Sequence, residues 1–151
     1  MYDILHRVGI KASPRDVYHA LATIDGLATW WTTTTTGESK VGSIIEFRFG
    51  SLGGFDMMVS ALNPERRVAW EVVTGPEDWI GTEISFELRQ EDDYTIVLFK
   101  HRGWRQRTEF MHHCSTKWGT FLMSLKSSLE SGKAAAWPDD VKIDNLEAAA
   151  A

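Results

Sequence analysis

The most regular feature of the sequence is a two-residue alternation of side chains. In residues 2–10, Tyr2, Ile4, His6, Val8 and Ile10 alternate with Asp3, Leu5, Arg7 and Gly9. Successive side chains of a β-strand point to opposite faces, so this alternation predicts a strand. The same pattern predicts further strands at residues 43–49, 55–62, 67–73, 82–90 and 95–102. Short turns rich in Gly, Pro, Asn and Asp separate them, which favours an antiparallel meander.

The last third of the chain has a different spacing. Between residues 108 and 131, apolar side chains recur at steps of three and four. This spacing places them on one face of a helix, the longest that the sequence predicts. Gly132 is positioned to end that helix. The apolar positions are Phe110, Cys114, Trp118, Phe121, Leu122, Leu125 and Leu129.

Two shorter helices are expected after the first strand. Ser13 is a good N-cap and Pro14 suits a first helical turn, so a helix is predicted over about residues 14–22. Asp25-Gly26 is expected to break it, before a second helix at about residues 27–31. The threonines that follow, Thr32–Thr36, disfavour helix and are expected to form a loop.

Together these elements predict an α+β fold. An antiparallel sheet of six or seven strands with one apolar face can bury that face against the apolar stripe of the long helix. The sheet is therefore expected to curve around the C-terminal helix, while the two short helices close one end. Such an arrangement leaves room for a cavity between the sheet and the helix.

The chain has 151 residues, which is the length of one domain. Residues 1–132 are assigned to this domain, and residues 133–151 to an irregular tail that lacks periodicity. Within the tail, Leu146-Glu147 followed by four alanines is typical of residues appended during cloning, and carries no information on the fold.

Composition and charge narrow the function classes. The net charge is −5 at pH 7 without a basic stripe, which argues against nucleic acid as a partner. The single cysteine, Cys114, cannot form an intramolecular disulfide, and this favours a cytoplasmic location. No apolar run approaches the roughly 20 residues that span a bilayer, and no signal peptide is recognisable.

Seven tryptophans is a high number for this length, and tryptophan often lines pockets. Strand alternation and the helical stripe together indicate which large side chains face the space between sheet and helix. Both a pocket for an apolar ligand and an ordinary well-packed core are compatible with this set. The candidate ligand-binding residues are Trp30, Trp31, Phe47, Phe49, Trp70, Phe86, Phe99, His101, Trp118 and Phe121.

The stretch ATWWTTTTTG at residues 28–37 is expected to lie at the mouth of the cavity. Neighbouring residues on a helix point about 100° apart, so Trp30 and Trp31 are expected to differ in role. One ring should face the cavity and the other should pack against the first helix or cover the rim. The position of Trp31, directly before the threonine run, favours it as the cavity residue, with the threonines as a polar rim.

The polar candidates are few. His101 is expected either to be a polar group inside the cavity or to be a hydrogen-bonded residue at a strand end. His112, His113 and Cys114 are adjacent and lack the spacing of metal ligands, so no metal is predicted. A cysteine on an apolar helical stripe is typical of packing. The sequence contains no nucleophile elbow and no phosphate-binding loop, so no catalytic residue and no cofactor is assigned.

One cationic cluster precedes the long helix. Arg102, Arg105 and Arg107 lie close to Trp104 in the sequence. They are expected either to hold an acidic group of a ligand near the cavity mouth or to form a solvated hinge.

Several motifs carry a resemblance to a known family. They are SPRDVYHAL at 13–21, WW at 30–31, VGSIIEFRFG at 41–50, LNPERRVAWEV at 62–72, TEISFEL at 82–88 and KWGTFLMSLKSSLESG at 117–132. Their order and spacing over residues 1–132 resemble the helix-grip fold of the SRPBCC superfamily, which includes the START lipid-binding domains. Within it, the motifs are similar to the branch of the activator of the heat-shock-protein ATPase, a co-chaperone.

The resemblance implies a fold but several activities, because the superfamily includes cyclases, lipid carriers and co-chaperone modules. The leading hypothesis is that the chain binds a small hydrophobic molecule in the cavity, without covalent catalysis. One alternative is a cyclase-like or dehydratase-like enzyme that uses His101 as acid or base. Another is a protein-interaction module with a chaperone partner, although the co-chaperone carries a second domain that these 151 residues do not contain. A homodimer is left open.

Overall fold

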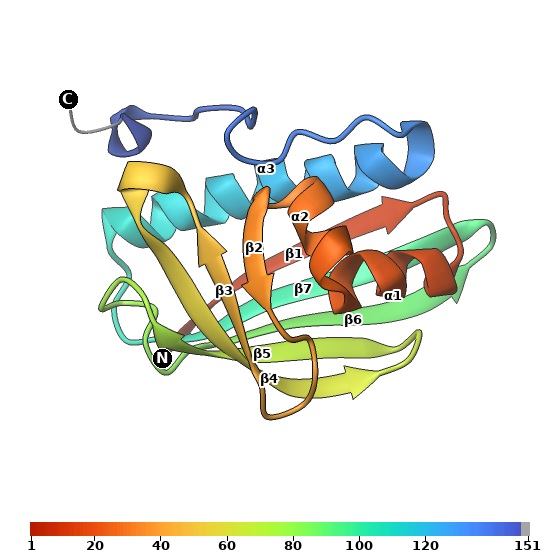
Figure 1. Ribbon diagram of the computed structural model, residues 1–151, viewed down its shortest axis with the longest axis horizontal. Helices are drawn as coiled ribbons and strands as arrows, with labels where there is room; N and C mark the ends of the chain where they lie inside the picture. Colours follow the sequence, from red (N-terminus) through yellow and green to blue (C-terminus); the bar gives the residue numbers. More distant parts are fainter. Residues whose placement is uncertain (149–151) are drawn as a thin grey trace.

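The computed structural model describes residues 1–148, so the final alanines, 149–151, lie outside the described residues. Seven antiparallel strands form one sheet in the order β1-β7-β6-β5-β4-β3-β2 (Figure 1). This confirms the prediction of six or seven strands. The strands are β1 (Tyr2–Ile10), β2 (Thr34–Gly37), β3 (Ile44–Arg48), β4 (Gly54–Asn63), β5 (Arg67–Thr74), β6 (Glu83–Glu91) and β7 (Tyr94–Trp104).

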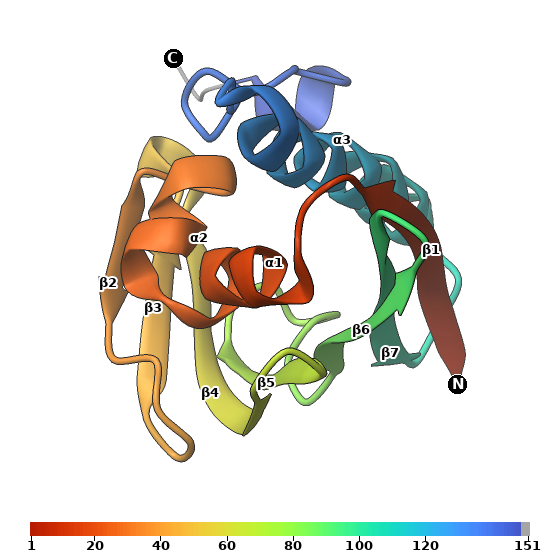
Figure 2. The same cartoon turned by 90° about the vertical axis from the view of Figure 1, so that its right-hand side faces the viewer.

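The sheet curves around the helices, as Figure 2 shows. The helices are α1 (Pro14–Ala22), α2 (Ile24–Trp30) and the long α3 (Glu109–Ser131), and two short 3₁₀ turns are η1 (Gly50–Leu52) and η2 (Asn145–Glu147). α3 lies across the open side of the curved sheet, and α1 and α2 close one end. The α+β helix-grip arrangement is therefore confirmed.

The ends of α3 follow from its sequence. Thr108 caps the N-terminus, where its side chain accepts a hydrogen bond from the backbone N–H of Met111. Gly132 ends the helix with φ of 73°, a left-handed conformation that glycine adopts without a steric penalty. The predicted span of 108–131 is correct to within one residue.

The predicted break at Asp25-Gly26 is wrong, because both residues lie inside α2. The chain turns at Thr23 instead, whose hydroxyl donates to the carbonyl of His19 and accepts from the N–H of Gly26. Gly26 is needed for packing: a Cβ at this position would lie 2.7 Å from backbone atoms of Ala20. The glycine therefore marks a close contact between two helices rather than a break.

The predicted threonine loop is also wrong, because Thr34–Gly37 form strand β2 along the edge of the sheet. β-branched side chains favour strands. Thr32, which precedes the strand, makes hydrogen bonds that hold the turn leading into it. The Thr32 hydroxyl donates to the Arg48 carbonyl at 2.6 Å, and the Thr35 hydroxyl donates to the Thr32 carbonyl at 2.6 Å. The threonine run is thus held to the sheet by hydrogen bonds.

After α3, the chain returns over the helix toward the edge of the sheet. The N–H of Trp137 donates to the carbonyl of Trp31 at 2.8 Å, and the N–H of Thr33 donates to the carbonyl of Trp137 at 3.1 Å. The hydroxyl of Ser124 on α3 accepts from the N–H of Ala135 at 2.9 Å. These bonds fix residues 133–148, which we call the C-terminal segment, against α2, β2 and α3.

Among residues 1–148, no helix is long and apolar enough to cross a membrane.

Candidate functional site

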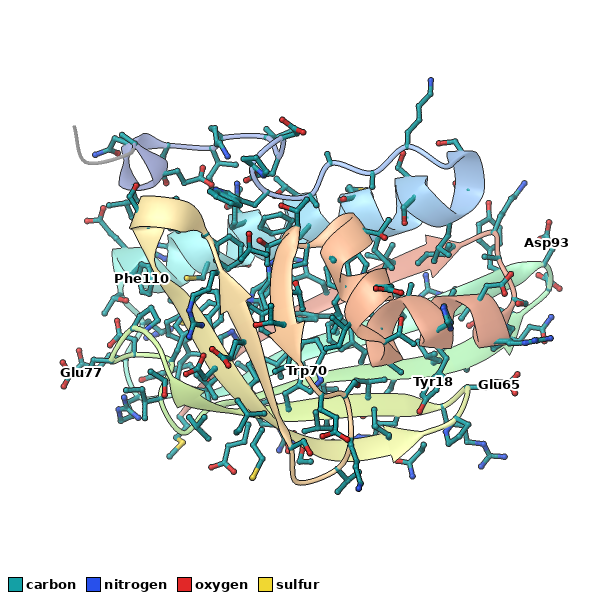
Figure 3. The ribbon with its side chains drawn as sticks, in the orientation of Figure 1. Tyr18, Glu65, Trp70, Glu77, Asp93 and Phe110 are labelled. Atoms are coloured by element: carbon teal, nitrogen blue, oxygen red, sulfur yellow. The ribbon has the colours of Figure 1, made fainter. Side chains whose placement is uncertain are left out.

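A pocket of about 650 Å³ opens at the end of the molecule where α3 begins. Four parts of the chain surround it: the first half of α3, the η1 turn, the loop between β5 and β6, and the C-terminal segment. Figure 3 labels Phe110 at this end and Trp70 nearer the centre of the sheet. Most of the lining is apolar. The principal side chains are those of Trp31, Phe49, Leu52, Phe55, Trp79, Phe110, His113, Cys114, Lys117, Trp118, Phe121, Trp137, Asp140, Leu146 and Glu147.

Stacked aromatic rings form one wall of the pocket. The ring of Trp79 is parallel to that of Phe55, with 4.0 Å between centroids and 5° between planes. On its other side Trp79 faces Trp118 at 5.9 Å and 20°. The loop that carries Trp79 is held by the Thr82 hydroxyl, which donates to the Trp79 carbonyl at 2.5 Å. The wall is therefore flat, rigid and apolar.

The structure places Trp30 and Trp31 in different surroundings. Trp31 lines the pocket, where its ring centroid lies 4.3 Å from that of Phe47 and 4.9 Å from that of Trp118. Trp30 does not line it, and its indole N–H donates to the carbonyl of Ala20 on α1 at 2.9 Å. This is the division expected from the helical spacing, with Trp31 on the pocket side.

Of the ten candidate residues, the structure brings four to the pocket wall: Trp31, Phe49, Trp118 and Phe121. The other six do not line the pocket and are fully buried. Phe47, Trp70, Phe86 and Phe99 extend the aromatic packing under the pocket, from β3 to β7. Together with Trp30 and His101, they form the core that supports the wall.

His101 lies behind the aromatic wall rather than in the pocket. The Trp118 indole N–H donates to its Nδ1 at 3.2 Å, so Nε2 carries the proton and donates to the Thr82 hydroxyl at 2.8 Å. Complete burial lowers the pKa of His101 to about 3, which keeps the ring neutral. His101 therefore connects Trp118 to the loop of Trp79 and has no nitrogen free for acid–base work at the pocket.

The polar side of the pocket is an ionic cluster between α3 and the C-terminal segment. Lys117 Nζ lies 2.5 Å from Asp140 Oδ2 and also contacts the carboxylate of Glu147. One turn earlier on α3, His113 Nδ1 donates to Asp144 Oδ2 at 2.7 Å. Burial opposes ionisation of Asp140, but hydrogen bonds from Lys117 and Lys142 outweigh it and lower the pKa of its carboxyl. The cluster fixes the C-terminal segment over the pocket.

Cys114 lines the same pocket rather than a separate one. Burial raises the pKa of the Cys114 thiol to about 12, so the thiol stays protonated at neutral pH. Within residues 1–148, no three His, Cys, Asp or Glu side chains are grouped so as to hold a metal ion.

The cationic cluster before α3 is also dispersed. The Arg105 guanidinium donates to the backbone carbonyls of Glu77 and Ile80, and that of Arg107 lies over the Tyr2 ring. None of Arg102, Arg105 and Arg107 lines the pocket. Arg105 therefore supports the loop and Arg107 the N-terminal strand, whereas Arg102 pairs with Glu83 on β6.

Sequence reasoning missed several lining residues. Trp79 follows Gly75-Pro76 in a predicted turn, where a tryptophan is costly to expose and is therefore a signal of a covered site. Lys117 lies four residues before Phe121 and so shares its side of α3. Trp137 and Asp140 belong to a segment without periodicity, and no local pattern indicates where such a segment packs.

Comparison with known proteins identifies the family. The family model described as Activator of Hsp90 ATPase homolog 1-like protein matches residues 11–130. The chain belongs to the Activator of Hsp90 ATPase homolog 1-like family. No curated protein matches the chain.

Solved structures agree with this family and fold. The chain is similar to the Aha1 dimer from Colwellia psychrerythraea, with 50% identity, a TM-score of 0.83, and 89% of this chain and 100% of that chain covered. SSP2350 from Staphylococcus saprophyticus shares 15% identity at a TM-score of 0.74, over 96% of this chain and 99% of that one. DynU16, from the dynemicin biosynthetic locus, shares 20% identity at 0.71, over 87% of this chain and 48% of that one. The last two similarities concern the fold alone.

Proposed function

We propose that this member of the Activator of Hsp90 ATPase homolog 1-like family binds a small hydrophobic molecule in the pocket between the sheet and α3. The observation that carries the proposal is a pocket of about 650 Å³ with a stacked aromatic wall. Binding sites for small molecules have volumes of about 300–1,000 Å³ and mainly apolar walls with a few polar groups. A core packed for stability alone leaves few voids larger than a water molecule.

The positions of His101 and Cys114 favour binding over a mechanism that uses either residue as acid, base or nucleophile. A general acid or base must come within hydrogen-bond reach of the substrate. His101, the residue that a cyclase-like mechanism would use, is separated from the pocket by Trp118 and Trp79. Cys114 does line the pocket, but its thiol is protonated at neutral pH and is a poor nucleophile.

The experiment is a titration with a fluorescent naphthalene dye, combined with native mass spectrometry of the freshly purified protein. Leu52 lies at the pocket mouth and is already 42% exposed, so Leu52→Asp should weaken dye binding without unfolding the chain. Leu5→Asp is the matched control, because Leu5 is an exposed leucine on β1 away from the pocket. Equal dye affinities in both variants and the unmodified chain, with no molecule retained, would reject the proposal.

We also propose that the chain forms a homodimer, because the Colwellia relative with 50% identity is described as a dimer. Light scattering coupled to size-exclusion chromatography should give twice the chain mass of 17.1 kDa. A monomer mass at every concentration tested would contradict this.

The family match supports a second candidate, interaction with an Hsp90-type chaperone. The test is the ATPase rate of such a chaperone with and without the purified chain. An unchanged rate, and no complex by light scattering, would remove this candidate.

A further inference from the structure

The loop between β5 and β6 carries Trp79, whose ring lies between those of Phe55 and Trp118 in the aromatic wall. The loop begins at Gly75 and ends at Gly81, and both glycines have positive φ, of 152° and 85°. Glycine adopts such angles without a steric penalty, so these two residues do little to fix the orientation of the loop. The position of the wall therefore depends on the contacts of the residues between them.

The second half of the loop is held from the sheet. The Thr82 hydroxyl donates to the Trp79 carbonyl at 2.5 Å, and the N–H of Gly81 donates to the carbonyl of Val72 on β5 at 2.9 Å. Both bonds lie at Trp79 or after it. They leave the first half of the loop without a tie to the sheet.

The side chain of Arg105 supplies that tie from the outer side. Its Nη2 donates to the Glu77 carbonyl at 2.6 Å, and its Nη1 donates to the Ile80 carbonyl at 3.2 Å. Within residues 1–148, the structure gives residues 76–78 no other hydrogen bond to a different part of the chain. We call these two bonds the arginine clamp.

The clamp joins two sides of the pocket. Arg105 directly follows the end of β7 and lies four residues before Glu109, where α3 begins. The first half of α3 forms another side of the pocket through Phe110, Cys114 and Trp118. A guanidinium is a planar group whose donors have a fixed geometry, so two bonds to one loop restrain both its distance and its orientation.

We propose that Arg105 is a positioning residue of the pocket, which sets the affinity for a small hydrophobic molecule by holding the Trp79 wall in place relative to α3. Arg105 does not line the pocket, so it acts through Trp79 and not by contact with the ligand. This inference rests on the proposed binding function and extends it to a residue outside the pocket. Without the clamp, the wall is in place in only a fraction of the molecules, and the apparent affinity decreases by that fraction.

The test is a titration with Prodan, an uncharged naphthalene dye, so that loss of a charge has no direct effect on binding. Arg105→Met keeps the apolar stem and removes both donors. Its affinity for the dye should be roughly tenfold lower, which corresponds to a wall in place in about one molecule in ten. The urea midpoint should change little, because the Arg105 side chain is exposed. Arg107→Met is the matched control, since Arg107 lies over the Tyr2 ring and makes no contact with the loop.

Two further variants separate positioning from a general structural effect. Arg105→Lys keeps a positive donor that can reach one carbonyl at a time, so it should recover part of the lost affinity. In Trp79→Leu the ring of the wall is missing, so adding Arg105→Met should lower the affinity no further. A general loosening of the chain would lower the affinity in both backgrounds.

Amide hydrogen exchange follows the loop directly. In Arg105→Met, exchange should become faster at Trp79 and Ile80, whose N–H groups bond within the loop, whereas the amides of β1 should keep their rates. Equal dye affinities of Arg105→Met and the unmodified chain, or an undiminished effect of Arg105→Met in Trp79→Leu, would overturn the positioning role and leave the apolar pocket intact. Absence of dye binding to the unmodified chain would overturn both proposals.

Discussion

At the scale of single residues, His101 shows how a buried polar group organises an apolar site. It accepts a hydrogen bond from Trp118 on α3 and donates one to Thr82, which in turn donates to the carbonyl of Trp79. Two tryptophans from separate parts of the chain are thereby fixed relative to each other. The sequence left open whether His101 is catalytic or structural. In the structure, it supports the pocket wall.

The low pKa of His101 predicts a dependence of stability on pH. The unfolded chain has an ordinary histidine pKa near 6.5, so it binds a proton that the folded chain excludes down to about pH 3. The contribution of His101 is fully present above pH 6.5 and decreases by up to about 1.4 kcal/mol per pH unit as the pH falls through this window. Urea unfolding of the unmodified chain and of His101→Gln at several pH values isolates this term. Parallel pH profiles for the two proteins would contradict it.

Trp30 and Trp31 should respond differently to truncation. Trp30→Ala creates a closed void and removes the donor for the Ala20 carbonyl, so it should cost about 3–5 kcal/mol of folding free energy and leave dye affinity unchanged. Trp31→Ala should cost a similar amount, because this ring is also buried and packs against those of Phe47, Trp70 and Trp118. Unlike Trp30→Ala, it should also weaken dye binding, because Trp31 lines the pocket. Unfolding midpoints and dye titrations check both variants, and equal dye affinities in the two would refute the division.

At the scale of elements, glycines test the packing of the helices. Gly26→Ala should destabilise the chain by about 1–3 kcal/mol, because the new Cβ would lie 2.7 Å from the backbone of α1. Gly119→Ala on α3 is the matched control: its Cβ would meet only His6 Cε1 at 4.0 Å. It should therefore stabilise α3 by up to about 1 kcal/mol. Denaturant midpoints with opposite shifts are expected, and shifts of the same sign would disprove the contact.

A helix or strand could be predicted from the sequence where a single spacing of apolar side chains extended through the whole segment. β1 and α3 carry uninterrupted alternation or a continuous apolar stripe, and their bounds agree with the prediction to within a residue. Thr32–Thr36 has no such pattern, since five identical side chains have no periodicity. Its strand depends on pairing with β3, a contact between distant segments.

The site was predictable only in part for the same reason. Trp31 and Trp118 belong to regular elements whose inward faces the sequence indicates, and both line the pocket. Trp79 lies in a loop and Trp137 in the C-terminal segment, so their positions depend on how those segments fold back. Local periodicity carries no information on that step.

At the scale of the whole molecule, each edge of the sheet is contacted at one point by another part of the chain. On β1, the Lys126 ammonium from α3 donates to the carbonyl of Gly9 at 2.5 Å. Two residues before β2, Thr32 forms an isolated parallel bridge with Trp137 of the C-terminal segment. Edge strands with free backbone groups are sites of aggregation, so these contacts protect the backbone at Gly9 and Thr32 from pairing with another copy.

The bridge at Trp137 predicts how the C-terminal segment is attached. Trp137→Ala removes the ring that packs against Phe49 at 6.2 Å between centroids and should loosen the segment around it. Amide hydrogen exchange should become faster at Thr33 and Ala135, whereas the amides of β6 and β7 should keep their rates. Uniformly faster exchange would mean that the segment belongs to the global folding unit instead.

The aromatic wall also has an optical consequence. Four of the seven tryptophans, Trp31, Trp79, Trp118 and Trp137, border the pocket. Trp30 stacks on Trp31 at 5.9 Å, and Trp31 on Trp70 at 6.0 Å, so excitation absorbed by the buried rings can pass between indoles to the pocket. A bound molecule that absorbs where tryptophan emits would therefore quench the fluorescence of nearly the entire protein. The intrinsic tryptophan emission can therefore report whether the pocket is occupied, without an added fluorescent label.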